Sequence, residues 1–151
     1  MDDYRVVGID IKIESPYGSD GEILHDPQGH IGTLLATVDP DRTKVLSFID
    51  PYGHTVFNQL QIPVLIAEIE AAAAEISTKR LRTHNEAMLE AARAAKWAST
   101  IVKEYEVGAS ASDDQLRLQI ARVKSHIEKV LGLLRQAANA GPHHLVRFIG
   151  D

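Results

Sequence analysis

Cysteine is absent from this chain of 151 residues. Its absence excludes a disulfide framework, a metal site built on thiolates and a cysteine nucleophile. Long apolar runs are absent too, since none approaches the roughly 18 residues that a membrane span requires. The first residues, MDDYR, are acidic and lack the basic-then-apolar order of a secretory signal peptide. We therefore expect a soluble cytoplasmic protein without membrane contact.

Local catalytic signatures are also missing. The chain contains no glycine-rich phosphate loop, no G-x-S-x-G elbow and no H-E-x-x-H pair. These absences count against the enzyme classes that a short motif identifies. They leave open an enzyme whose residues converge from distant segments.

Composition and charge are those of an acidic globular domain. Apolar residues make up 44% of the chain and charged residues 25%, which at this length predicts one domain over residues 1–151. The net charge is −5, so we expect no nucleic acid partner. Residues 1–60 hold ten acidic and four basic side chains, whereas residues 113–151 hold four and six. This asymmetry indicates either attraction within one fold or an acidic face for a basic protein partner.

The first third of the chain has the signals of strands and turns. Apolar residues alternate with polar ones over Tyr4–Glu14, which predicts a half-buried antiparallel strand. Ser15–Gly29 is rich in Pro and Gly and is expected to be a long connection. His30–Val38 and Thr43–Ile49 are predicted as the second and third strands, which makes residues 1–50 a β-meander.

After that point the spacing of apolar residues changes from 2 to about 3.6, which predicts a helical part over residues 55–140. Thr55 is expected to cap a short helical turn, and Pro63 to lie in the first turn of a long helix. That helix should break near Ser77–Asn85, where apolar residues become sparse.

The strongest helix signal follows Ser112, which forms a capping-box pattern with Gln115. Gly141, followed by proline, is expected to end this helix, and residues 143–149 to return to the sheet as a closing strand. Strands followed by helices indicate an α+β fold. We expect an antiparallel sheet of about four strands, three N-terminal and one C-terminal, with two or three long helices packed on one face.

One segment, IDPYGHTVFNQLQ, concentrates side chains that carry chemistry. Its candidate site residues are Asp50, Tyr52, His54 and Asn58. They lie where a strand, a turn and a helix are expected to meet, and sites on sheet scaffolds often occupy such loops. The alternative is structural, because aspartate at the first position of a turn binds backbone N–H groups.

A metal site is the sharpest chemical hypothesis for this segment. Asp50 and His54 have the carboxylate and imidazole ligands that divalent metals take, and His144 would complete the set if the last strand lies nearby. Asp151 at the end of the chain is a further candidate ligand or partner contact. No other cofactor is expected.

The basic cluster Lys79, Arg80 and Arg82 lacks interleaved aromatic residues, so it is poor evidence for nucleic acid binding. It is interpreted as a solvated face or as ion-pair partners of nearby glutamates.

Two segments together resemble a known pattern. FIDPYGHTVFNQLQ resembles a D-P-Y-G-x-T-x-F-N-x-L-Q motif, and HHLVRFIGD resembles an H-x-L-x-F-x-G-D terminus. The pair is similar to small bacterial proteins without an assigned function, and it covers 23 of the 151 residues. The resemblance implies no activity and no catalytic residues. It does imply that the exit of the third strand and the C-terminus form one spatial feature.

Three functional hypotheses follow. The favoured one is a non-enzymatic protein-interaction module of the immunity or accessory type, whose acidic surface suits a basic partner. The second is a small metal-dependent hydrolase that uses Asp50, His54, a C-terminal histidine and Asp151. The third is a structural homodimer, formed through the alanine-rich helical stripes and Trp97.

Overall fold

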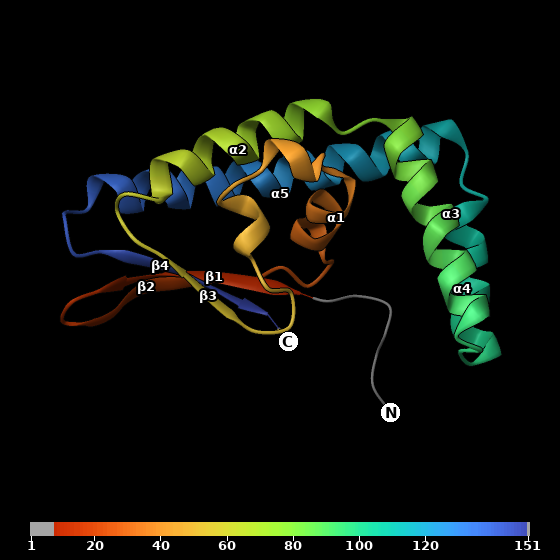
Figure 1. The fold of residues 1–151 in the computed structure, drawn as a ribbon, viewed down its shortest axis with the longest axis horizontal. Helices are drawn as coiled ribbons and strands as arrows, with labels where there is room; N and C mark the ends of the chain where they lie inside the picture. The colour runs from red at the N-terminus through yellow and green to blue at the C-terminus, as the bar shows by residue number, and fades with distance from the viewer. Residues whose placement is uncertain (1–7, 151) are drawn as a thin grey trace.

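The computed structural model describes residues 8–150, apart from the side chains of residues 19–22. It is an α+β fold in which helices cover one face of a four-stranded antiparallel sheet (Figure 1). The strands lie in the order β2-β1-β4-β3, and their bounds are β1 Ile9–Ser15, β2 Gly18–Leu24, β3 His54–Phe57 and β4 Leu145–Gly150. Strand β4 pairs with both β1 and β3, so the predicted return of the last strand to an early one is confirmed.

The alternation predicted for the first strand is confirmed for its described part. Ile9, Ile11 and Ile13 are buried under the helices. The rest of the predicted strand, residues 4–7, lies outside the described residues. The long connection predicted over Ser15–Gly29 is wrong, because strand β2 occupies its middle. Ser15 donates a hydrogen bond from Oγ to the carbonyl of Gly18 at 2.9 Å and closes a tight β1–β2 hairpin.

The second predicted strand, over His30–Val38, is instead helix α1 (His30–Thr37). Its first turn begins where the buried carboxylate of Asp26 accepts the N–H groups of His30 at 2.8 Å and Ile31 at 3.2 Å. Gly29, with a φ of 68°, turns the chain into this helix. Asp26 therefore starts a helix that the pattern of apolar residues alone did not indicate.

The third predicted strand, Thr43–Ile49, is wrong as well. The chain forms two short 3-10 helices, η1 (Pro40–Arg42) and η2 (Leu46–Phe48). The Glu68 carboxylate accepts the N–H groups of Lys44, Val45 and Leu46 at 2.6 to 3.2 Å. In a strand, these N–H groups would donate to a neighbouring strand. Because they donate to Glu68 instead, the predicted meander over residues 1–50 does not form.

The helical part confirms most of the predicted boundaries. Its remaining helices are α2 Ile62–Glu75, α3 Thr78–Ala94, α4 Ser99–Ala109 and α5 Asp113–Asn139. Pro63 lies in the first turn of α2, Ser77 caps α3 at the predicted break, and the capping box of Ser112 begins α5. Thr55 is wrong as a helix cap, because it lies within β3.

Helices α1, α2 and α5 form the layer on the sheet, whereas the α3–α4 hairpin stands off at one end, away from the sheet (Figure 1). A second break, between α3 and α4, was not predicted. Ala91, Ala95 and Ala98 are exposed, and the buried residues of this hairpin are Leu81, Ala92 and Ile101. Within residues 8–150, no helix combines the length and the apolar character that crossing a bilayer requires.

Candidate functional site

The two motif segments come together at the β3–β4 ladder. The rings of Phe57 and Phe148 meet edge to face, with centroids 5.4 Å apart. The N–H of Gly150 donates to the carbonyl of Gly53 at 2.8 Å, and a Cβ on Gly150 would lie 2.3 Å from the carbonyl oxygen of Pro51. The single spatial feature implied by the resemblance is therefore present as a tight junction between a turn and a strand end.

The predicted site residues of the first motif hold that junction in shape. Asp50 Oδ1 accepts the N–H of Tyr52 at 2.9 Å, as an aspartate that opens a turn does. Asn58 Oδ1 accepts the N–H groups of Leu60 and Gln61 at 3.0 and 3.1 Å. Both side chains therefore have the structural role that was the alternative to chemistry.

The proposed metal ligands are far apart. His54 lies opposite Ile149 in the sheet, whereas His144 precedes β4 at its other end. Five residues of strand separate these two positions, or roughly 16 Å. His54 Nδ1 also lies 3.4 Å from the Arg147 guanidinium, a poor neighbour for a metal cation.

Among residues 8–150, no group of three or more His, Asp or Glu side chains is arranged to hold a metal ion. Asp50, His54 and His144 are therefore not brought together. Asp151 lies outside the described residues.

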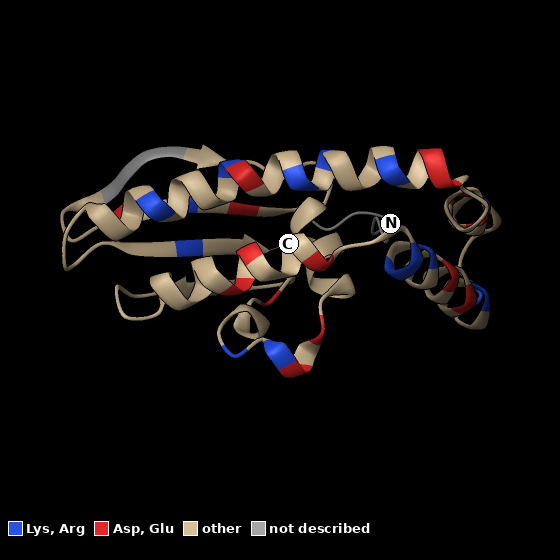
Figure 2. Cartoon of the chain, turned by 90° about the horizontal axis from the view of Figure 1, so that it is seen from above, with Lys and Arg blue, Asp and Glu red and all other residues tan. Residues whose placement is uncertain are grey.

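Several of the described acidic side chains of residues 8–60 are engaged within the fold. Glu14 accepts hydrogen bonds from the Arg147 guanidinium, which hold the pKa of Glu14 below its usual value. Asp26 is fully buried, and Asp39 pairs with Arg42. Figure 2 shows Lys and Arg positions spaced along α5, on the helical side of the molecule. Pairs such as Glu14–Arg147 fit the interpretation of attraction within one fold.

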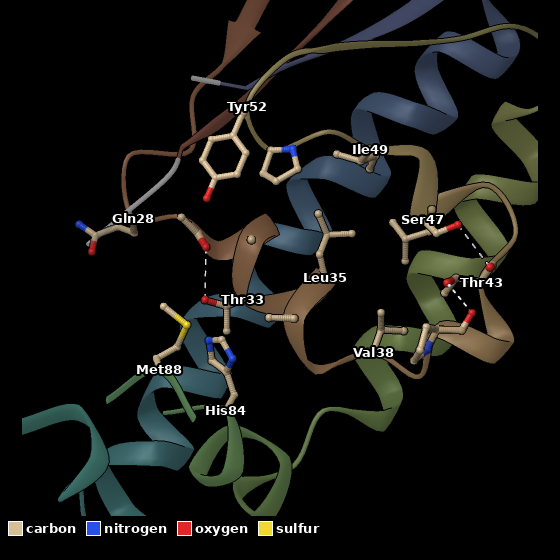
Figure 3. Close-up of a pocket in the computed structure, with 16 residues that line it drawn as sticks. Gln28, Thr33, Leu35, Val38, Thr43, Ser47, Ile49, Tyr52, His84 and Met88 are labelled. Atoms are coloured by element: carbon tan, nitrogen blue, oxygen red, sulfur yellow. Dashed lines mark hydrogen bonds between the residues drawn. The ribbon is translucent and has the colours of Figure 1, made fainter. Parts of the chain in front are cut away.

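A hollow of about 500 Å³ lies between α1, residues 40–52 and α3, and we call it the α1 pocket (Figure 3). Sixteen residues line it. Its apolar wall includes Leu35, Val38, Ile49 and Met88. None of the sixteen is Asp, Glu, Lys or Arg, so the walls carry no formal charge at neutral pH.

The threonine and serine hydroxyl groups of the α1 pocket are already engaged with the backbone. Thr33 Oγ1 donates to the carbonyl of Gly29 at 3.2 Å, and Thr43 Oγ1 donates to that of Pro40 at 3.3 Å. Ser47 Oγ donates to the carbonyl of Thr43 at 3.5 Å. These hydroxyl groups shape the pocket wall, and their protons are already donated to the backbone and not to a ligand.

Three other polar side chains of the pocket have no hydrogen-bond partner among the described residues: Gln28, Tyr52 and His84. Burial lowers the pKa of His84, so its imidazole is neutral at pH 7 and offers one donor and one acceptor. Tyr52 is 71% exposed. Of these residues only Tyr52 was predicted as a site residue, because Gln28 and His84 carry no local sequence signal.

A second hollow, of about 570 Å³, adjoins the first, and we call it the α3 pocket. It shares Ala36, Val38 and His84 with the α1 pocket, so the two form one groove along the outer side of α1. Its far end differs in character, because two basic side chains, Lys79 and Arg80, and one acidic side chain, Asp39, line it. The groove thus passes from an uncharged half to a basic half.

The buried carboxylate of Asp26 fixes the start of α1, the helix that lines this groove. Besides the start of α1, it accepts the N–H of Ile9 at 3.4 Å, and His126 Nε2 of α5 lies 3.6 Å from Oδ1. Burial lowers the pKa of His126, whose ring lies 5.5 Å from that of His30. The Asp26 side chain therefore ties the start of α1 to β1, which keeps this groove wall in place.

No family model, curated protein or solved structure matches this chain. The resemblance carried by the two motif segments stays a prediction. The function has to be inferred from the geometry of the groove.

Proposed function

We propose that the protein is a non-enzymatic interaction module that receives an extended, partly apolar segment of a partner protein in the groove along α1. One observation carries the proposal: the α1 pocket has no charged wall, while Gln28, Tyr52 and His84 stay free to form hydrogen bonds. Sites of this kind take an apolar group fixed by a few polar contacts. A charged group would lose its hydration there without a counter-charge.

The chemistry of the pocket supports binding over catalysis. Its titratable lining residues are His84 and Tyr52, and no carboxylate of the lining orients the imidazole. General acid–base catalysis by histidine usually relies on such a partner. The hydrolase alternative also loses support from the separation of Asp50, His54 and His144.

The shape of the groove favours a chain segment over a small metabolite. Two hollows that share three lining residues make an elongated site. Tyr52 stands largely exposed beside it, and exposed aromatic side chains at a pocket are typical anchors of protein interfaces.

Filling the groove tests the proposal. Ala36 is exposed on α1 and lines both hollows, so Ala36→Trp blocks the groove without entering the core. Ala71 is exposed on α2 and lines neither hollow, which makes Ala71→Trp the matched control. Thermal melts of both variants establish that the fold is retained.

Proteins captured from the source cells by the wild-type chain would be purified, and their Kd measured against the three forms by calorimetry. We expect Ala71→Trp to bind like the wild type and Ala36→Trp to bind at least tenfold more weakly, which is about 1.4 kcal/mol. Partners that bind the blocked variant as well as the wild type would refute the proposal. A neutral metabolite that competes for the groove would reassign it as a small-molecule site.

A further inference from the structure

The charges at the α3 pocket do not balance. Asp39 is compensated, because it accepts the N–H of Asp41 at 3.0 Å and lies 3.7 Å from Nε of Arg42. Arg80 donates from Nη1 to Glu75 Oε2 and to the carbonyl of Thr37, both at 3.4 Å. Lys79 is exposed, and its ammonium group has no hydrogen-bond or ion-pair partner among the described residues. Among the residues that line this end of the groove, two positive side chains, Lys79 and Arg80, therefore accompany one negative side chain, Asp39.

The distance between the α1 pocket and the α3 pocket determines how far apart the side chains of a bound segment must be along its sequence. On helix α3, Lys79 lines the α3 pocket and Met88 lines the α1 pocket, nine residues and therefore about 13 Å apart along the helix. An extended chain advances about 3.3 Å per residue, so it covers that length in three or four residues.

We propose that the bound partner segment carries an acidic side chain three or four positions from the apolar residue that fills the α1 pocket. This inference rests on the proposed function. The carboxylate lies at Lys79, with Arg80 beside it, while the apolar residue lies against the uncharged wall near Leu35 and Met88. A polyanion such as nucleic acid is disfavoured, because the net charge of the chain is −5.

A random linear peptide library displayed on phage supplies the probe, since it presupposes no partner. It would be selected in parallel on the wild type, Ala36→Trp, Lys79→Ala and Lys124→Ala. Lys124 is an exposed lysine of α5 that lines neither hollow, so it controls for the loss of one positive charge.

We expect the wild type and Lys124→Ala to enrich peptides with a large apolar residue and an Asp or Glu three or four positions away. Lys79→Ala should keep the apolar preference and lose the acidic one. A synthetic consensus peptide should bind Lys79→Ala about two- to fivefold more weakly, the range of an exposed ion pair. Replacing its acidic residue by the amide should add no further loss on Lys79→Ala.

The outcomes separate the two proposals. Groove-dependent peptides without an acidic preference would overturn this inference and leave the proposed function standing. If Lys124→Ala weakens the consensus peptide as much as Lys79→Ala does, the inference is also overturned, because the effect is then one of overall charge. An absence of peptides that require an open groove would overturn both.

Discussion

The Glu68 carboxylate should be one of the strongest single contributors to stability outside the core. It accepts three consecutive backbone N–H groups, from Lys44, Val45 and Leu46, and so anchors the η2 segment to α2. Leu46 is 1% exposed, so water cannot readily replace the partner of its N–H. The Glu68→Ala variant removes all three acceptor contacts at once.

The expected magnitude follows from those contacts. A hydrogen bond to a charged group contributes about 1.5–3 kcal/mol. The N–H of exposed Lys44 regains a partner from water, which leaves two bonds lost. We therefore expect Glu68→Ala to lower the free energy of unfolding by about 3–6 kcal/mol. Glu68→Gln keeps one acceptor oxygen and should lose roughly half of that.

Urea denaturation followed by circular dichroism measures this loss, with Glu70→Ala as the matched control. Glu70 is exposed on the same helix and forms only a surface pair with Arg135 at 3.2 Å. Its removal should change stability by less than about 1 kcal/mol. The reasoning is refuted if the two alanine variants have the same free energy of unfolding.

Three further predictions concern pH, backbone packing and metals. Burial holds the pKa of His84 and of His126 below the usual 6.5, so both are neutral in the fold at pH 7. The stability that these two neutral histidines contribute is complete above pH 6.5 and is lost as the pH falls below it, because the unfolded chain takes up protons first. Urea denaturation at pH 7.5 and at pH 5.5 measures this loss. Equal free energies of unfolding at the two pH values would contradict it. Gly150→Ala should destabilise by more than about 2 kcal/mol, because its Cβ would lie 2.3 Å from a backbone carbonyl oxygen. Gly132→Ala, in open space on α5, should instead stabilise by about 0.5–1 kcal/mol, and a reversed order in thermal melts would contradict the packing described here. Chelator-treated protein should show no shift in Tm with Zn²⁺ or Mn²⁺, and a shift abolished by His54→Ala would restore the metal hypothesis.

The candidate site was predictable in part. The motif around Asp50 was recognisable because turn and cap residues act on their sequence neighbours. Its function was not, since the same residues serve structure and chemistry equally well. Of the groove, only Tyr52 was singled out, because Gln28 and His84 become a site only when α1 and α3 are brought together. Lys79 and Arg80 were recognised as a basic cluster, but the sequence of their own helix does not indicate that they line a pocket against α1.

The sequence by itself determined the features whose causes are local. The capping box at Ser112, the position of Pro63 and the alternation along β1 each follow from contacts within a few residues or from a repeating apolar face. The α+β class was predicted correctly, although two of the three N-terminal strands on which that prediction rested do not form.

Tertiary structure decided the state of η2, whereas the start of α1 depends on Asp26, only four residues before His30; the whole segment over residues 30–49 was predicted as two strands and forms α1, η1 and η2. Its apolar residues are compatible with either state, so the partners of its backbone N–H groups settle which one forms. Those partners are the carboxylates of Asp26 and Glu68, and Glu68 is more than twenty residues away along the chain. The groove exists for the same reason, since both carboxylates hold its walls. A buried donor must find an acceptor somewhere in the fold, and only the assembled fold determines which acceptor it finds.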